Sequence, residues 1–159
     1  MTQTDHTSAL DAPAPTPLSD PPAPAPAPAP HRHQVHVRWS DQDILGHVNN
    51  AKYVQYLQEA MSSWHLERPD VGVLVAKTVS VEYRELMIYE TGRETYVDAW
   101  VAEIGNRSVR LIFHVRDERA LYAVAEAVFV AVDPATAGSR PLTPVERAHL
   151  SRHLIARPE

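Results

Sequence analysis

The sequence contains one segment with the pattern of an amphipathic helix. A short strand-like segment precedes it, and a long strand-rich region follows it. From Tyr53 to Trp64, large apolar residues recur at steps of three and four, which is the spacing of one face of an α-helix. Asn49 or Asn50 is a suitable N-cap, since asparagine accepts hydrogen bonds from the first free amides. Pro69 ends the helix because proline disfavours the α conformation in the residue before it. The predicted buried face consists of Tyr53, Tyr56, Leu57, Ala60, Met61 and Trp64.

The sequence on both sides of this helix has the pattern of antiparallel strands. Residues 34–39 alternate between apolar and polar side chains, which predicts a half-buried strand that leads directly into a turn. Beyond the helix, Gly105-Asn106 is a typical hairpin turn between two strand-like segments. The first strand-like segment after the helix is long and is expected to be bent or bulged. The predicted strands after the helix cover residues 71–89, 94–102, 108–115 and 121–132.

These elements predict an α+β fold in which an antiparallel sheet of about five strands wraps round one long central helix. Thr143 to Glu146 form a capping box with proline at the first helical position, and this predicts a short C-terminal helix. A sheet of this size leaves an open edge and a partly open core. We therefore expect a homodimer or a dimer of dimers.

The first 31 residues are expected to form a disordered tail, and residues 32–159 the folded domain. Residues 11–30 are mostly alternating Pro and Ala, which favour extended polyproline conformations and offer nothing large to bury. The tail contains Asp5, Asp11 and Asp20 but no Lys or Arg, so only −2 of the net charge of −5 belongs to the domain. A nearly neutral domain lacks the basic footprint of a nucleic-acid-binding protein.

The composition also argues against several kinds of functional site. The chain has no cysteine, which excludes disulfides, thiol catalysis and thiolate metal sites and fits a cytoplasmic protein. No apolar run is long enough to cross a membrane. The nine histidines do not form a recognisable ligand set, so no metal or cofactor is predicted.

Residues 39–59 contain the densest set of groups that could do chemistry. Asp41 and Asp43 lie two residues apart, and Gly46-His47 follows just before the helix begins. A carboxylate can activate water, and a helix N-terminus can stabilise a developing negative charge. Asp41 is expected to serve the turn or a cap. On the residues alone, Asp43 suits either the same structural role or a chemical one.

This segment resembles the motif of the hotdog-fold thioesterases, in particular the 4-hydroxybenzoyl-CoA thioesterase-like branch. The resemblance covers about residues 34–156 and is supported by residues 80–84 and 105–108. It implies a hotdog fold and an acyl-CoA substrate, which water hydrolyses without a metal or a cofactor. The residues that carry it are Asp41-x-Asp43-x-x-Gly46-His47-Val48-Asn49-Asn50-x-x-Tyr53.

The resemblance also implies roles for individual residues. Asp43 falls at the catalytic aspartate, as a general base or as a nucleophile that forms an acyl-enzyme anhydride. Amides near Gly46 would polarise the thioester carbonyl, and His47 would orient the substrate or the carboxylate. The expected substrate-binding residues are Asn50, Tyr53 and Arg107, the last beside a CoA phosphate.

Two other functions stay open at this point. Hotdog hydratases, which add water to enoyl thioesters, usually separate their Asp and His by four residues that include Asn and Pro. Here three residues, none of them Asn or Pro, separate Asp43 from His47. Leu45 also replaces the asparagine of the Asp-Asn-His set found in acyl-carrier-protein thioesterases. A non-catalytic acyl-thioester-binding module would be expected to lose the acid, which this chain retains.

Overall fold

The computed structural model describes residues 28–68 and 70–155, and the structural findings concern these residues. Most of the predicted tail over residues 1–31 therefore lies outside the described residues. The order of elements confirms the predicted α+β class. The elements are β1 (His31–Val35), the 3-10 turn η1 (Trp39–Asp41), α1 (Asn50–Glu67), β2 (Leu74–Tyr83), β3 (Thr95–Ile104), β4 (Ser108–Arg116), β5 (Leu121–Ala131) and α2 (Pro144–Ser151).

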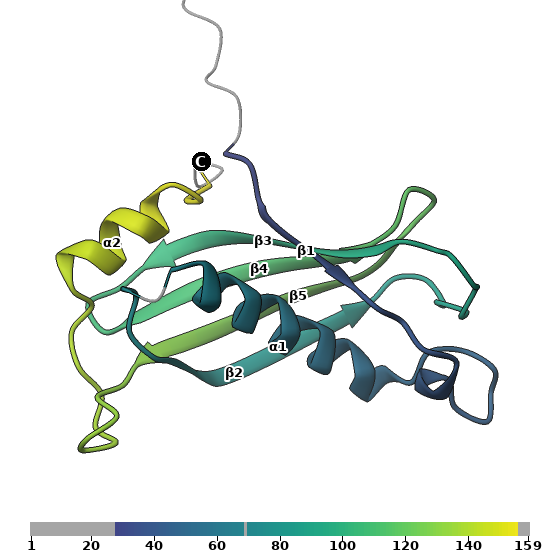
Figure 1. Cartoon of the computed structure of the whole chain (residues 1–159), viewed down its shortest axis with the longest axis horizontal. Helices are drawn as coiled ribbons and strands as arrows, with labels where there is room; N and C mark the ends of the chain where they lie inside the picture. Colours follow the sequence, from purple (N-terminus) through teal and green to yellow (C-terminus); the bar gives the residue numbers. More distant parts are fainter. Residues whose placement is uncertain (1–27, 69, 156–159) are drawn as a thin grey trace, which may run out of the picture.

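The five strands form one antiparallel sheet in the order β1-β3-β4-β5-β2, and α1 lies across one of its faces (Figure 1). This arrangement confirms the predicted sheet around a central helix. β1 and β2 are the two edge strands, although they flank α1 in sequence. The predicted irregularity in the first strand after the helix is present as a register shift in β2 between Ala76 and Thr78.

The core lies between α1 and the facing side chains of β3, β4 and β5. All but one of the residues of the predicted helix face are buried, and the exception, Met61, is half-buried. Opposite them, Phe113 of β4 pairs with Ala99 of β3 and Ala125 of β5. Small residues beside a large one allow helix and sheet to interlock at close range. The core is therefore made by the long helix and the three central strands.

Both helix caps have the predicted form. The Asn49 side chain accepts a hydrogen bond from the amide of Ala51, which caps α1 at 2.9 Å. Thr143 and Glu146 form the reciprocal capping box of α2. No helix in the described part of the chain is both long and apolar enough to span a membrane.

The strand predicted over residues 34–39 is wrong in position. β1 ends at Val35, and Trp39 lies in η1 with 74% of its surface exposed. The reason is a local turn in which the carboxylate of Asp41 accepts the amide hydrogen of Arg38 at 2.9 Å. The polar and apolar alternation therefore continues past the point where the strand stops.

The strand predicted over residues 71–89 is too long. β2 covers only its middle, because its partner β5 begins at Leu121 and the last pair is Tyr83 with Ala123. Beyond that pair only Leu121 and Tyr122 of β5 remain, and the Tyr122 carbonyl accepts the amides of Arg84 and Glu85 where residues 84–94 leave the sheet. These residues form the β2–β3 loop, which contacts the candidate site.

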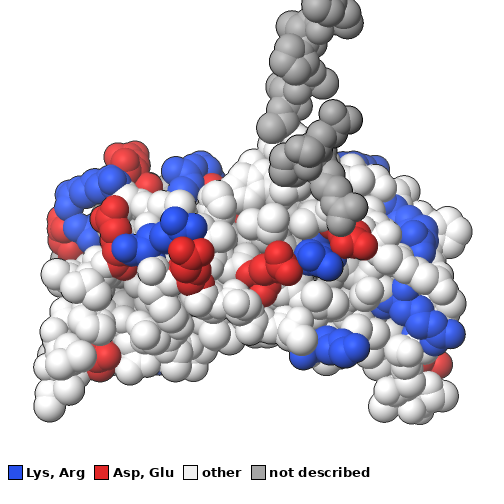
Figure 2. Space-filling model, turned by 180° about the vertical axis from the view of Figure 1, so that it is seen from behind, with Lys and Arg blue, Asp and Glu red and all other residues white. Residues whose placement is uncertain are grey.

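The face of the sheet opposite α1 carries positive and negative side chains side by side (Figure 2). Asp98 is buried there beneath two guanidinium groups, 2.6 Å from Arg32 and 2.7 Å from Arg116. Burial alone would raise the pKa of Asp98, but the hydrogen bonds from these arginines outweigh it and lower the pKa below its usual range. Charges of both signs are thus paired locally on this face.

Candidate active site

The predicted catalytic segment forms a tight turn between η1 and α1. The amide of Asp43 donates to the carbonyl of His47 at 3.0 Å, and the amide of Gly46 donates to the carbonyl of Asp43 at 3.0 Å. Gly46 has a φ of 78°, in the left-handed region that glycine enters at little cost. The turn therefore brings Asp43, Gly46 and His47 together at the positive end of the α1 dipole.

The Asp43 carboxylate is only partly satisfied by the protein. One oxygen accepts the amide of Leu45 at 2.9 Å, and the other lies 3.4 Å from the amide nitrogen of the Asn49 side chain. The His47 Nδ1 atom lies 4.0 Å from that second oxygen. The side chain of Asp43 is 23% exposed. Since a carboxylate oxygen can accept about two hydrogen bonds, Oδ2 keeps room for water or substrate.

Two backbone amides near Gly46 are free to bind an oxyanion. The Gly46 amide itself is occupied, because it donates to Asp43. Among the described residues, the amides of His47 and Asn50 donate no hydrogen bond. Asn50 is the first residue of α1, where an unpaired amide and the helix dipole both favour negative charge. These two amides, which follow Gly46 in the chain, therefore keep a hydrogen for an acceptor, whereas the Gly46 amide does not.

Asp41 anchors the turn in the core, in agreement with its predicted structural role. Its side chain is buried and accepts the Tyr56 hydroxyl at 2.8 Å, while Lys52 lies 3.3 Å away. Burial alone would raise the pKa of Asp41, but hydrogen bonds from Arg38, Tyr56 and Lys52 outweigh it and leave the pKa below its usual range. Asp41 is therefore an ionised structural group.

Two of the three predicted substrate-binding residues, Asn50 and Tyr53, contact the same tyrosine, and Arg107 lies apart from them. Asn50 is exposed at the start of α1, and its carbonyl accepts the Tyr83 hydroxyl at 3.0 Å. Tyr53 is buried, which raises its pKa to about 12, and its ring forms a T-shaped pair with the Tyr83 ring. Arg107 donates to the carbonyl of Ser139 at 2.5 Å, at the end of the sheet where β4 begins. Within one protomer, Arg107 is remote from the turn.

Sequence reasoning missed the β2–β3 loop as a support of the turn. The carbonyl of Met87 accepts the amide of Val48 at 2.7 Å, and the amide of Tyr89 donates to the side chain of Gln42 at 3.1 Å. Val48 and Gln42 lie on the two sides of the turn and form a β-bridge with each other. The loop therefore holds both sides of the segment that carries Asp43.

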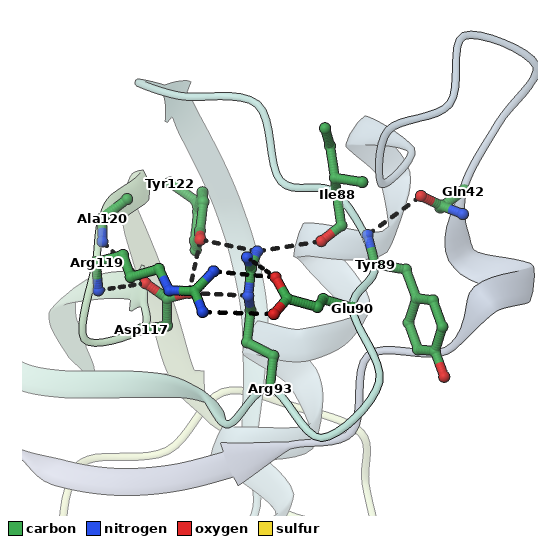
Figure 3. A network of polar contacts seen from close by, with 9 residues as sticks. All are labelled: Gln42, Ile88, Tyr89, Glu90, Arg93, Asp117, Arg119, Ala120 and Tyr122. Atoms are coloured by element: carbon green, nitrogen blue, oxygen red, sulfur yellow. Dashed lines mark hydrogen bonds and ion pairs between the residues drawn. The ribbon is translucent and has the colours of Figure 1, made fainter.

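Arg93 ties this loop to the β4–β5 hairpin (Figure 3). Its guanidinium donates to the carbonyl of Ile88 at 3.2 Å and to the hydroxyl of Tyr122 at 3.3 Å. It also pairs with Glu90 and lies 3.4 Å from the buried carboxylate of Asp117. These residues are far apart in sequence. Only the charged residues beside the turns at 90–93 and 117–120 could have pointed to such a network.

Exposed apolar side chains surround the turn. Ile44 and Leu45 lie on the turn itself, with 100% and 75% of their surfaces exposed. Trp39 on η1 and two residues of the β2–β3 loop, Leu86 and Ile88, are also more than half exposed. Several exposed apolar side chains on neighbouring segments are typical of a binding or association site. In the described part of the chain, no group of three or more His, Cys, Asp or Glu is arranged to hold a metal ion.

The family model of the thioesterase-like superfamily matches residues 37–153, which include the turn, both helices and strands β2 to β5. The chain belongs to the thioesterase-like superfamily. This membership confirms the resemblance to hotdog-fold thioesterases that the Asp43 motif carries. A search of curated proteins gives no match.

Solved structures agree with this membership. A candidate acyl-CoA thioesterase from Xanthomonas campestris is 31% identical, with a TM-score of 0.59 over 69% of this chain and 97% of that one. A thioesterase from Thermus thermophilus, complexed with coenzyme A and Zn, is 27% identical, with a TM-score of 0.66 over 77% and 92%. A predicted thioesterase from Bacillus stearothermophilus shares the fold at 23% identity, with a TM-score of 0.71 over 82% and 100%.

Proposed function

We propose that this protein hydrolyses acyl-CoA thioesters to CoA and a carboxylic acid, with Asp43 as the reacting carboxylate. Membership of the thioesterase-like superfamily supports a thioester hydrolase in general. The role proposed for Asp43 rests on the exposure and the hydrogen bonding of its carboxylate. It is a partly exposed carboxylate with accepting capacity to spare, beside free amides at the start of α1.

Two routes are compatible with this geometry. As a general base, Asp43 takes a proton from water while the water oxygen attacks the thioester carbon. As a nucleophile, it attacks that carbon itself, and water then hydrolyses the acyl-aspartyl anhydride. On either route the C–S bond breaks, and CoA leaves as a thiolate that is then protonated. The amides of His47 and Asn50 stabilise the thioester oxygen as it becomes negative, and the His47 ring orients the carboxylate.

The active form in this proposal is a homodimer. β2 is an edge strand with most of its side chains exposed, including Val75 and Val79. In a two-fold symmetric dimer, two β2 edges pair in antiparallel fashion, so the start of one strand lies opposite the end of the other. Arg107 lies at the Leu74 end of the sheet, because its carbonyl accepts the amide of Ala131, the pairing partner of Leu74.

This symmetry gives Arg107 a place in the site. The turn with Asp43 lies at the Tyr83 end of β2, where Tyr83 contacts Asn50. Antiparallel pairing brings the Arg107 end of one protomer beside the turn of the other. Arg107 would then contact a CoA phosphate bound to its partner's site, as a guanidinium does well. Asn50 and Tyr53 would line the thioester end of the same site.

The test is thiol release from a panel of acyl- and aroyl-CoA esters. Asp43→Asn should abolish hydrolysis while the oligomeric state and folding stay unchanged. Asp133→Asn is a matched control, since Asp133 accepts the amide of Ala135 at 2.9 Å just as Asp43 accepts that of Leu45. Full activity in Asp43→Asn would refute the assigned role. Water addition to crotonyl-CoA without thiol release would indicate a hydratase, and binding without turnover a binding module.

A further inference from the structure

A cavity of about 520 Å³ lies along the C-terminal half of α1, away from the turn that carries Asp43. It is partly open to solvent and is bordered by α1, the start of β2, the facing side chains of β4 and β5, and α2. The proposed catalytic residues do not line it. The lining side chains are Gln58, Met61, Ser62, Trp64, His65, Leu66, Val71, Val73, Leu74, Val75, Ala76, Leu111, Phe129, His149 and Leu150.

The chemistry of this cavity suits an uncharged hydrocarbon. Among the described residues that line it, none is Asp, Glu, Lys or Arg. Burial and the neighbouring Arg68 guanidinium lower the pKa of His149, so this histidine is neutral at physiological pH. Leu111 and Phe129 form part of the wall and are themselves core residues. A cavity of this size and lining would take an apolar chain and exclude a charged group.

Only a long acyl chain whose thioester lies at the turn can extend as far as the cavity. A helix rises about 1.5 Å per residue, so Gln58 and His65 lie about 12 Å and about 22 Å from Asn50 along α1. A fully extended chain of single bonds advances about 1.2 Å per bond. A chain that starts at the turn would therefore enter the cavity after about ten bonds and fill it after about eighteen.

Two half-exposed valines lie between the turn and the cavity, one on α1 and one on β2. α1 and β2 run in opposite directions, and the bond from Tyr83 to Asn50 joins them at the end that carries the turn. Between this contact and the cavity, Val54 of α1 and Val79 of β2 are 42% and 41% exposed. Each element therefore offers an apolar side chain to an alkyl chain that runs from the turn to the cavity.

We propose that the cavity holds the distal part of a long, unbranched acyl chain while its thioester lies at the turn. The proposal rests on the proposed thioesterase function and specifies its substrate class as long-chain fatty acyl-CoA, of about 12 to 18 carbons by the distances above. An aroyl group or a short acyl group at the turn would leave the cavity empty.

Kinetics with saturated acyl-CoA esters of 4 to 18 carbons test the proposal, each ester being kept below its micelle threshold. Beyond about ten carbons, kcat/KM should rise about fourfold per methylene until the cavity is full. Ser62→Phe places a ring at the cavity and should reduce the ratio of hexadecanoyl to butanoyl kcat/KM about tenfold or more. Ala76→Phe should do the same from β2. Ser63→Phe, one residue further along α1, is the control because Ser63 does not line the cavity.

A binding measurement separates this proposal from the proposed function. Isothermal titration with hexadecanoate should show binding to the wild-type protein and to Ser63→Phe, and none to Ser62→Phe. If no thioester is hydrolysed but this pattern holds, the thioesterase assignment fails and the alkyl site stands. If thioesters are hydrolysed without chain-length preference and hexadecanoate does not bind, the alkyl site is refuted. An unchanged chain-length ratio in both folded Phe variants also refutes it.

Discussion

Tyr56 donates its hydroxyl hydrogen to Oδ2 of Asp41 at 2.8 Å, with both side chains buried. This bond joins the central helix to the turn that carries the candidate catalytic carboxylate. Burial, together with the Asp41 carboxylate, raises the pKa of Tyr56, so the hydroxyl stays protonated and donates throughout the physiological pH range. A buried hydrogen bond thus couples the helix to the turn that carries Asp43.

Tyr56→Phe should lower the free energy of unfolding by about 1.5 to 3 kcal/mol at pH 7, the usual range for a bond to a charged group. The pKa of Asp41 lies below its unfolded value of 3.8, so this stabilisation is present above about pH 4 and is lost as the pH falls. Chemical denaturation at pH 7 and at low pH should show the difference between variant and wild type shrinking. Tyr96→Phe, whose hydroxyl contacts exposed Glu94, should change stability little.

A comparison of Gly46→Ala with Gly92→Ala should distinguish the effect of the turn conformation on kcat from the effect of a general loss of stability. Gly46 and Gly92 both have a φ of 78°, and a Cβ at either position meets nothing within 4 Å. Alanine at each should therefore cost about 1 to 2 kcal/mol, from backbone strain alone. Only Gly46→Ala should lower kcat, because only Gly46 shapes the turn around Asp43. An equal loss of kcat in Gly92→Ala would show that the effect is not specific to the turn.

Arg93→Ala should loosen the candidate catalytic turn, although Arg93 does not contact Asp43. The variant removes the bonds between the β2–β3 loop and the hairpin, and it should cost about 2 to 3 kcal/mol because Asp117 is left partly unpaired. Hydrogen exchange at the Val48 amide, which donates to Met87 in this loop, should accelerate. Exposed Arg119 pairs only with Glu90 among the described residues, so Arg119→Ala should leave stability nearly unchanged.

The parts of this fold that local sequence determines could be predicted. The stripe from Tyr53 to Trp64, the caps at Asn49 and Thr143, and the hairpin at Gly105 each depend on residues within a few positions of one another. The ends of the edge strands could not be predicted in this way. β2 stops at Tyr83 because β5 begins at Leu121, and no local pattern records where a distant partner begins.

The same distinction applies to the candidate site: its local turn could be predicted from the sequence, and its tertiary contacts could not. The grouping of Asp43, Gly46 and His47 follows from one short turn and was predicted from its residues. The occupied Gly46 amide depends on the φ of that residue, which the residue type permits but does not determine. The supporting contact from Arg93 to Ile88 and the cavity beneath α2 arise from tertiary packing. Neither leaves a periodic pattern in the sequence.

Glu146→Gln should show how α2 is fixed to the rest of the fold. The Arg140 guanidinium, with the amides of Thr143 and Gly72, outweighs burial and lowers the pKa of Glu146 to about 2 from an ordinary value of 4.5. This difference corresponds to about 3 kcal/mol, which is present above pH 4.5 and is lost as the pH falls toward 2. Thermal unfolding at pH 7 should therefore show a clear loss of stability in the variant, and the loss should fade on acidification. Glu118→Gln, at an exposed turn position, should be neutral at both pH values. A loss in Glu146→Gln that persists at low pH would mean that side-chain shape, and not ionisation, makes this contact.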